Sequence, residues 1–227
     1  MRKILSFALA LVLIMTMLPM CVLAAEDAPN ERAELIALAC EVFPEYAPMI
    51  LGDISPFSAY CNPNGPADVV YQETRSISNT EEITLARYSN GATIIIEQSE
   101  ISSHDIIETS ANEKVVTNGV AYTLSYKIAA TSDFVEYYPG VLYISNFKAT
   151  VYDSGYDKIN SYGTISVNNS SYCTRYPVVV YSLQETASNA ASVHYPFQFH
   201  SPGNSSGTFP GSLAITVRNN EITVSLK

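Results

Sequence analysis

Residues 212–227 read SLAITVRNNEITVSLK, and this stretch predicts the class of the fold. Apolar and polar residues alternate on both sides of the central Asn-Asn pair, which is the pattern of two half-buried strands joined by a two-residue turn. Pairing Arg218 with Glu221 puts Val217 opposite Ile222, and the same register brings the other apolar residues onto one face. The pattern therefore predicts an antiparallel β-hairpin over these residues.

Residues 81–98, EEITLARYSNGATIIIEQ, give a second hairpin signal around an Asn-Gly pair. Asn-Gly favours a two-residue type I′ turn because both residues tolerate positive φ angles. With that turn, Leu85 pairs with Ile96 and Arg87 pairs with Ile94. We therefore expect Leu85, Ile94 and Ile96 on one face of the hairpin.

Period-two alternation recurs along the rest of the chain. In residues 140–152 it places Val141, Tyr143 and Phe147 on one face. About ten short strands of this kind predict a mainly β fold, an antiparallel β-sandwich or barrel. The remaining candidate strands, each flanked by Gly, Asn, Ser or Pro, are residues 69–75, 120–128, 158–167, 173–183 and 192–199.

One short amphipathic α-helix is expected before the strands. Residues 31–43, ERAELIALACEVF, place Leu35, Leu38, Ala39 and Val42 at helical spacing, and Asn30 is a suitable N-cap. Pro44 should end the helix, and a Pro-rich connector follows it up to Asp68. We expect residues 25–68 to pack on a single β domain formed by residues 69–227.

Residues 1–24 read as a secretory signal peptide, with Arg2 and Lys3 before an apolar run and small residues near the cleavage point. Cleavage before Ala25 predicts a secreted, extracellular protein with no stable membrane insertion. An alternative is lipid attachment at Cys21, although Met20 is large for the position before a lipidated cysteine.

Composition excludes some classes of protein. The chain is 47% hydrophobic with 8 Phe and 16 Tyr, which is enough apolar material for a folded core. Its net charge is −10 and it has no basic stretch, so nucleic acid is a poor candidate partner.

Three cysteines follow the signal segment. An oxidising compartment favours a disulfide between Cys40 and Cys61, which are 21 positions apart in the chain. Cys173 would then stay unpaired, either as a small buried residue or as a nucleophile or crosslink.

Tyrosine and histidine supply the candidate binding residues, because 16 Tyr and no Trp offer amphipathic surfaces for a protein or a glycan. The alternative is that these rings only fill the sheets. His194 and His200 would lie about 20 Å apart on an extended strand at ~3.3 Å per residue, which is too far for one metal ion. The full set is Tyr137, Tyr138, Tyr172, Tyr176, His194, Gln198 and His200, the last three on one strand face.

No catalytic residue, metal site or cofactor is assigned from the sequence. The G-x-S-x-G match around Ser205 lies between prolines and strands rather than between a strand and a helix. The sequence therefore favours a secreted, non-enzymatic β domain that binds a protein or a glycan at or near a cell surface. The alternative is an extracellular hydrolase whose site is assembled from distant strands.

Overall fold

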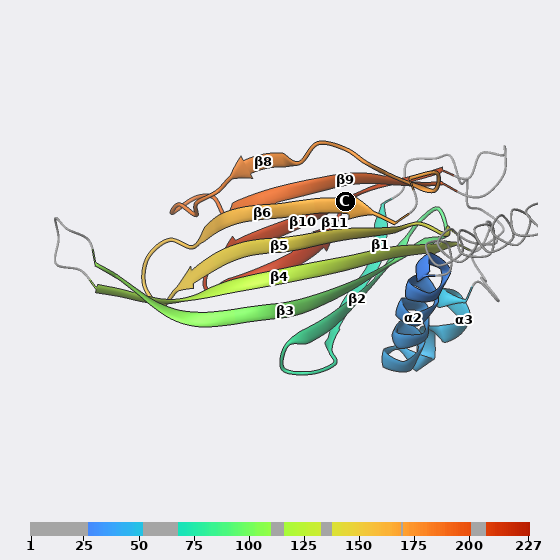
Figure 1. Ribbon diagram of the computed structural model, residues 1–227, viewed down its shortest axis with the longest axis horizontal. Helices are drawn as coiled ribbons and strands as arrows, with labels where there is room; N and C mark the ends of the chain where they lie inside the picture. The colour runs from blue at the N-terminus through green and yellow to red at the C-terminus, as the bar shows by residue number, and fades with distance from the viewer. Residues whose placement is uncertain (1–26, 52–67, 110–115, 133–137, 169, 201–207) are drawn as a thin grey trace, which may run out of the picture.

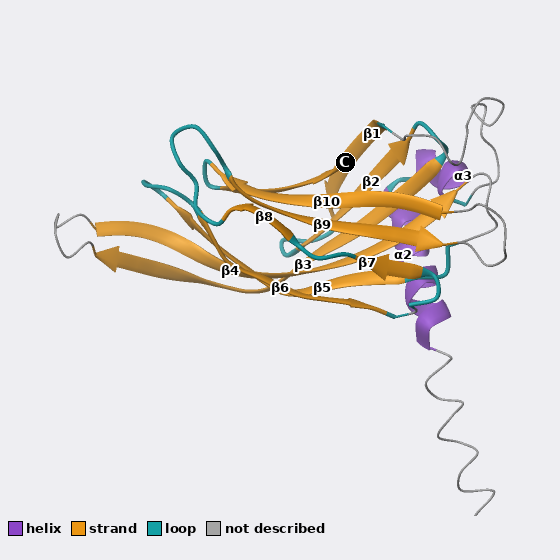
Figure 2. Ribbon diagram, turned by 90° about the horizontal axis from the view of Figure 1, so that it is seen from above, coloured by secondary structure: helices purple, strands orange, loops and turns teal. Residues whose placement is uncertain are grey.

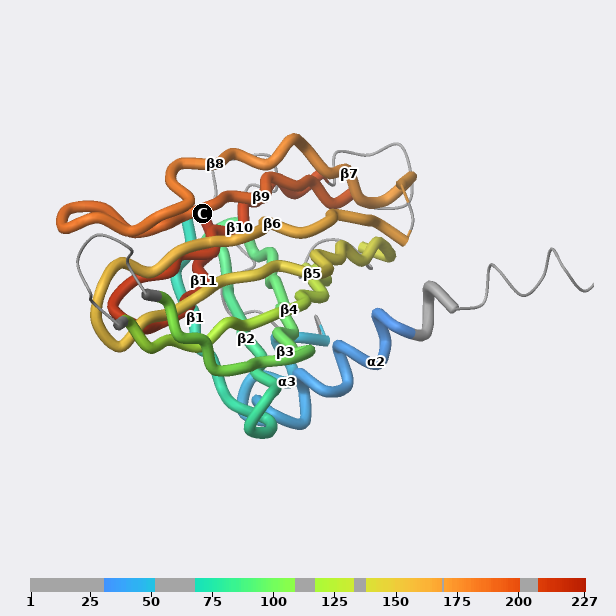
Figure 3. The backbone as a smooth tube through the Cα atoms, turned by 60° about the vertical axis from the view of Figure 1, so that its left-hand side comes forward, coloured from blue at the N-terminus to red at the C-terminus, as the bar shows by residue number. Residues whose placement is uncertain are grey.

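The computed structural model describes residues 27–51, 68–109, 116–132, 138–168, 170–200 and 208–227. These residues form two antiparallel β-sheets stacked face to face, with helices on the outer face of one sheet (Figures 1 and 3). The predicted class, a mainly β fold preceded by a short helix, is confirmed. The described strands form a sandwich of two separate sheets and do not close into a barrel.

The first sheet has six strands, and each strand pairs with the next one along the chain. β3 and β4 are the longest, and their hairpin extends beyond the sandwich at the end away from the helices (Figures 1 and 2). The six strands are β1 (Val69–Ser76), β2 (Glu81–Tyr88), β3 (Ala92–Thr109), β4 (Val116–Ser132), β5 (Val141–Tyr152) and β6 (Lys158–Val167).

The second sheet contains β7 (Cys173–Arg175), β8 (Val179–Ser182), β9 (Ala191–His200), β10 (Thr208–Arg218) and β11 (Glu221–Leu226). Its order is β11-β10-β9-β7, and β8 also pairs with β9. The β10–β11 hairpin has the predicted register, in which Arg218 pairs with Glu221. Asn219 and Asn220 have φ angles of 52° and 65°, as a type I′ turn requires.

The main core lies between the two sheets. Phe147 of the six-stranded sheet and Tyr195, Phe197 and Phe199 of the five-stranded sheet are at most 1% exposed. The rings of Phe197 and Phe199 meet edge to face, with centroids 5.3 Å apart. Each such side chain stabilises the fold by about 1.5–3 kcal/mol through burial.

A second, smaller core lies between the helices and the outer face of the six-stranded sheet (Figure 3). The helical segments are α2 (Asp27–Val42), the 3₁₀ turn η1 (Pro44–Tyr46) and α3 (Ala47–Ile50). Leu35 and Ala39 of α2 are buried against the sheet, as the helical spacing predicted. α2 ends before Pro44, but η1 and α3 show that the expected irregular connector begins with helical turns.

The predicted register of the β2–β3 hairpin is wrong by one residue. Leu85 pairs with Ile95, and the loop contains three residues because Gly91, at φ 87°, follows a turn in which its N–H donates to the Tyr88 carbonyl. Leu85 therefore faces the helices, whereas Ile94 and Ile96 face the other sheet. Both faces of this hairpin are buried, so its apolar run did not identify the register.

The alternation predicted for β5 is also interrupted. A β-bulge at Asn146, whose φ is 60°, changes the phase, so Ile144 and Phe147 both point into the main core. Tyr143 instead faces α2, where its hydroxyl donates to Glu31. Gly163 lies beside the bulge with φ 70°, and a Cβ there would be 2.3 Å from the Ser145 carbonyl oxygen.

Several sequence predictions lie outside the described residues. These are the signal segment 1–24 with Cys21, most of the connector, Cys61 with its predicted disulfide to Cys40, Tyr137 and the Ser205 loop. Among the described residues, neither Cys40 nor Cys173 forms a disulfide. No helix in the described ranges is both long enough and apolar enough to cross a membrane.

Candidate functional site

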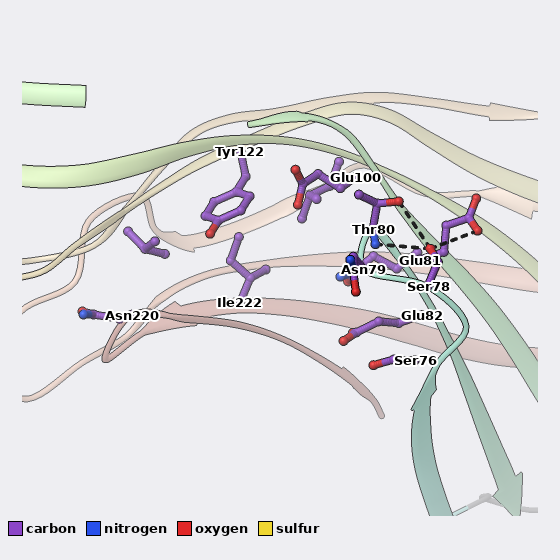
Figure 4. Close-up of a pocket in the computed structure, with 13 residues that line it drawn as sticks. Ser76, Ser78, Asn79, Thr80, Glu81, Glu82, Glu100, Tyr122, Asn220 and Ile222 are labelled. Atoms are coloured by element: carbon purple, nitrogen blue, oxygen red, sulfur yellow. Dashed lines mark hydrogen bonds between the residues drawn. The ribbon is translucent and has the colours of Figure 1, made fainter. Parts of the chain in front are cut away.

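A polar cleft of about 350 Å³ opens between the two sheets beside the β1–β2 turn. This volume lies at the lower end of the range for small-molecule sites, roughly 300–1,000 Å³. In Figure 4, Tyr122 and Ile222 extend toward each other from the two sheets, with Glu100 beside the tyrosine. The cleft is lined by Ser76, Ser78, Asn79, Thr80, Glu81, Glu82, Gln98, Glu100, Tyr122, Leu124, Val151, Asn220 and Ile222.

The β1–β2 turn closes one end of the polar cleft with an ordered set of hydroxyl groups. The Thr80 N–H donates to Ser78 Oγ at 3.2 Å, and Ser78 Oγ donates to Glu81 at 3.4 Å (Figure 4). The Glu100 N–H donates to the Thr80 carbonyl at 2.7 Å, which fastens β3 to this turn. Ser and Thr favour such local bonds, which link the residues of the polar turn to one another.

The strands that form the wall of the polar cleft carry polar residues at positions that face the core. Ile94 and Ile96 point into the main core, and the next two residues of the same phase are Gln98 and Glu100. On β2, the inward-facing residues likewise change from apolar to polar, from the buried Ala86 to Glu82. The inward face of the sheet thus changes from apolar to polar toward the cleft.

A β-bulge in β3 adjoins the polar cleft. The register between β3 and β4 shifts between Glu100 and Ser102, which leaves Ile101 63% exposed. Bulges bend a strand and redirect its side chains, and they are frequent beside binding sites. Burial, followed by the carboxylates of Glu100 and Asp105, raises the pKa of Tyr122. The Tyr122 hydroxyl therefore stays protonated and can donate a hydrogen bond.

None of the residues that line the polar cleft carries a positive charge, whereas three of them are glutamates. The cleft therefore presents carboxylate acceptors, together with amides and hydroxyls that both donate and accept. Within the described part of the chain, no group of three or more His, Cys, Asp or Glu side chains is arranged to hold a metal ion.

The predicted residues on β9 lie on the outer face of the five-stranded sheet, as the alternation indicated. They form pairs with neighbouring strands rather than one site. Gln198 accepts a hydrogen bond of 2.7 Å from the Tyr176 hydroxyl, and His200 Nε2 lies 3.0 Å from the Thr174 hydroxyl. β9 is a central strand, with β10 on one edge and with β7 and β8 on the other, and these side chains are half-buried.

His194 packs against Tyr181 of β8, with ring centroids 4.4 Å apart. Burial, and then the positive charge of Lys227, lowers the pKa of His194, so the imidazole is neutral at pH 7. The two rings are tilted by 55° to each other, and their contact joins the outer face of β9 to β8.

The remaining predicted residues do not join this group. Tyr138 is 3% exposed and its ring packs against Phe199 in the main core, so it offers no binding surface. Tyr172 is half-buried, and Tyr137 is outside the described residues. Cys173 is fully buried, and burial raises the pKa of its thiol to about 12, which favours a small buried residue over a nucleophile.

The polar cleft was missed by the sequence analysis because its residues come from β1 to β5 and from the β10–β11 turn. One signal was present in the sequence. The stretch SISNTEE at residues 76–82 combines hydroxyl, amide and carboxylate side chains, and the polar positions of β3 continue the phase of an apolar strand.

Comparison of the chain with protein-family models, with curated proteins and with solved structures gave no significant match.

Proposed function

We propose that the protein is a secreted, non-enzymatic β-sandwich domain that binds a glycan in the polar cleft. The observation that carries this proposal is the composition of the cleft wall, in which hydroxyl, amide and carboxylate groups surround one tyrosine ring. The secreted location rests on the sequence of residues 1–24.

The groups in the polar cleft match the chemistry of a sugar. Glu82 and Glu100 accept hydrogen bonds from sugar hydroxyls, and Gln98 and Asn79 both donate and accept. The Tyr122 ring supplies an apolar face with a polar tip, which suits the C–H face of a pyranose.

The charge of the cleft restricts the class of glycan. Its three glutamates repel carboxylate, sulfate or phosphate groups, and no lysine, arginine or histidine among the lining residues offsets them. We therefore expect neutral glycans or glycans with free amino groups, and we expect sialylated and sulfated glycans to be excluded.

A glycan array followed by isothermal titration calorimetry tests this proposal. Glu100→Gln removes one charged acceptor and should weaken binding about tenfold or more, because a hydrogen bond to a charged group contributes ~1.5–3 kcal/mol. Tyr122→Leu should weaken binding while it keeps apolar contact with the core. Tyr176→Ala, on the outer face, is the control and should leave the affinity unchanged. Binding that tolerates both cleft variants but fails in the control would contradict the proposal.

A hydrolase is the second candidate, because one cleft contains the carboxylates of Glu82 and Glu100 and glycosidases use a pair of carboxylates. Release of reducing ends from a bound oligosaccharide distinguishes the two functions. A binding domain leaves the ligand intact over days, whereas a glycosidase cleaves it and loses the cleavage in Glu82→Gln or Glu100→Gln.

A further inference from the structure

Exposed apolar residues cluster at one edge of the five-stranded sheet. Of the 12 large apolar residues that are exposed in the described chain, five lie within residues 176–183. They form what we call the apolar strip: Tyr176, Val179, Val180, Tyr181 and Leu183, exposed by 43%, 42%, 42%, 67% and 44%. Such a concentration on a soluble domain usually marks a surface that contacts another protein.

The apolar strip is free of charge in an acidic chain. No charged residue occurs between Arg175 and Glu185, although the chain has 22 acidic residues and a net charge of −10. The charged residues that flank the segment are bound within their own chain, Arg175 to the Ile165 carbonyl at 2.7 Å and the buried Glu185 to Arg218 at 3.6 Å. Two copies in antiparallel alignment therefore meet along an uncharged segment, with no like charges brought together.

β8, at the centre of the apolar strip, has an open edge. It pairs with β9, and none of the other described strands pairs with the second edge of Val179–Ser182. The open edge ends at Leu183, whose carbonyl accepts the Ile159 N–H of β6 at 2.8 Å. The edge of β11, in contrast, is occupied by Gln72, whose amide donates to the Val224 carbonyl at 2.9 Å and accepts from the Leu226 N–H at 3.3 Å. β1 carries Glu73 and Arg75, and charges of this kind protect a sheet edge against pairing.

We propose that a second copy of this chain pairs with β8, so that two five-stranded sheets join edge to edge about a two-fold axis. The exposed parts of the five side chains amount to roughly 500 Å² per copy, since an aromatic side chain presents ~150–250 Å². Two copies thus bury at most about 1,000 Å², the lower limit for a specific interface. β8 has only four residues and a register shift after Val180, so the dimer is weak and reversible.

The dimer would present two polar clefts at once. This consequence rests on the proposed glycan function, whereas the dimer itself does not. A bivalent protein binds a surface with repeated glycans more tightly than a monomer does, without any new contact to the sugar.

Sedimentation velocity over roughly 1–500 µM tests the dimer. The wild type should change from monomer to dimer with concentration, and added salt should favour the dimer because it screens the repulsion between two acidic copies. Val180→Lys and Tyr181→Lys should each weaken dimerisation about tenfold or more, because each brings like charges together. Val70→Lys is the control, since Val70 is 62% exposed on β1, at the opposite edge of the six-stranded sheet from β6, the strand that contacts the end of the apolar strip.

A wild type that stays monomeric throughout this range would overturn the proposal, including the case in which the apolar strip serves a different protein. Equal weakening by Val70→Lys would overturn it too, because the effect would then come from net charge alone. Thermal unfolding shows whether each lysine variant is folded. Binding of a monovalent sugar should be unchanged in Val180→Lys, which separates this test from that of the glycan site.

Discussion

Asp157 joins three segments of the sandwich that are distant in the sequence. Its side chain is fully buried and accepts backbone N–H groups from Tyr152 at 2.9 Å and from Asn220 at 2.8 Å. Its own N–H donates to Glu185 at 3.1 Å. The carboxylate therefore connects the β5–β6 turn of one sheet to the β10–β11 turn of the other.

Asp157→Ala should destabilise the fold by about 3 kcal/mol or more. The substitution removes two charged hydrogen bonds of ~1.5–3 kcal/mol each and leaves buried N–H groups without an acceptor. Because a domain of this size is stable by only ~5–15 kcal/mol, the loss is a large fraction of the total. Asp157→Asn should destabilise it less, because one carbonyl oxygen remains while the amide group faces a second donor.

Urea unfolding followed by tyrosine fluorescence measures the loss. Asp153→Ala is the matched control, because Asp153 is in the same turn and its side chain is exposed. We expect the control to lie within about 0.5 kcal/mol of the wild type. An ordinary hydrogen bond contributes ~1 kcal/mol to stability. If the free energy of unfolding of Asp157→Ala lies within about 1 kcal/mol of the wild-type value, the reasoning is refuted.

Three further predictions follow from the geometry. Cys173 should resist alkylation in the native protein, because burial raises the pKa of its thiol to about 12, and mass spectrometry should show rapid labelling only after unfolding in urea. Gly163→Ala should lower the melting temperature strongly, since the added Cβ would be 2.3 Å from the Ser145 carbonyl oxygen at a residue with φ 70°. Gly155→Ala is the control: the exposed turn has space for a Cβ, so only the positive φ destabilises this variant. His194 has a pKa below its ordinary value of 6.5, so the unfolded chain takes up the proton first as the pH falls. Stability should therefore decrease below about pH 6.5, and in His194→Gln that part of the decrease, measured by urea unfolding at several pH values, should be absent.

The turns decide how far the sequence predicts this fold. In the β10–β11 hairpin, Asn219 and Asn220 both adopt positive φ, and one face alternates regularly, so the predicted register is the observed one. In the β2–β3 hairpin, only Gly91 adopts positive φ, and the loop is one residue longer. The two turns look alike in sequence, but the extra loop residue puts Leu85 of β2 on the opposite face from Ile94 and Ile96 of β3.

Burial on both faces removes the second source of register information. The consecutive residues Ile94, Ile95 and Ile96 are all buried, with Ile95 under the helices and its neighbours under the five-stranded sheet. An alternating sequence predicts which face of a strand is buried, whereas a continuous apolar run does not. Which of the three isoleucines faces the helices depends on the position of α2 over the sheet, which is a feature of the tertiary structure.

The outer face of β9 and the polar cleft differ in how many strands contribute residues to them. His194, Gln198 and His200 were predicted from the alternation of one strand, and the structure places them on one outer face. Tyr176 was predicted from the tyrosine content of the chain, and its hydroxyl donates to Gln198. The polar cleft depends on strand order and on a bulge that no local pattern marks, since Ile101 interrupts the alternation without any glycine beside it. Sites that combine many strands in this way become visible only when the sheets are assembled.

Glu82, Gln98 and Glu100 give the strongest physical reason to regard the cleft as functional. Each lies on the face of its strand that, a few residues further on, fills the main core with Ala86, Ile94 or Ile96. Apolar side chains at these three positions would extend that core and stabilise the fold, because a carboxylate at the margin of an apolar interior must keep its contact with water. Proteins retain polar residues at such positions mainly where binding requires them, at a cost in stability. The inward polar residues therefore support the proposal that the cleft binds a ligand.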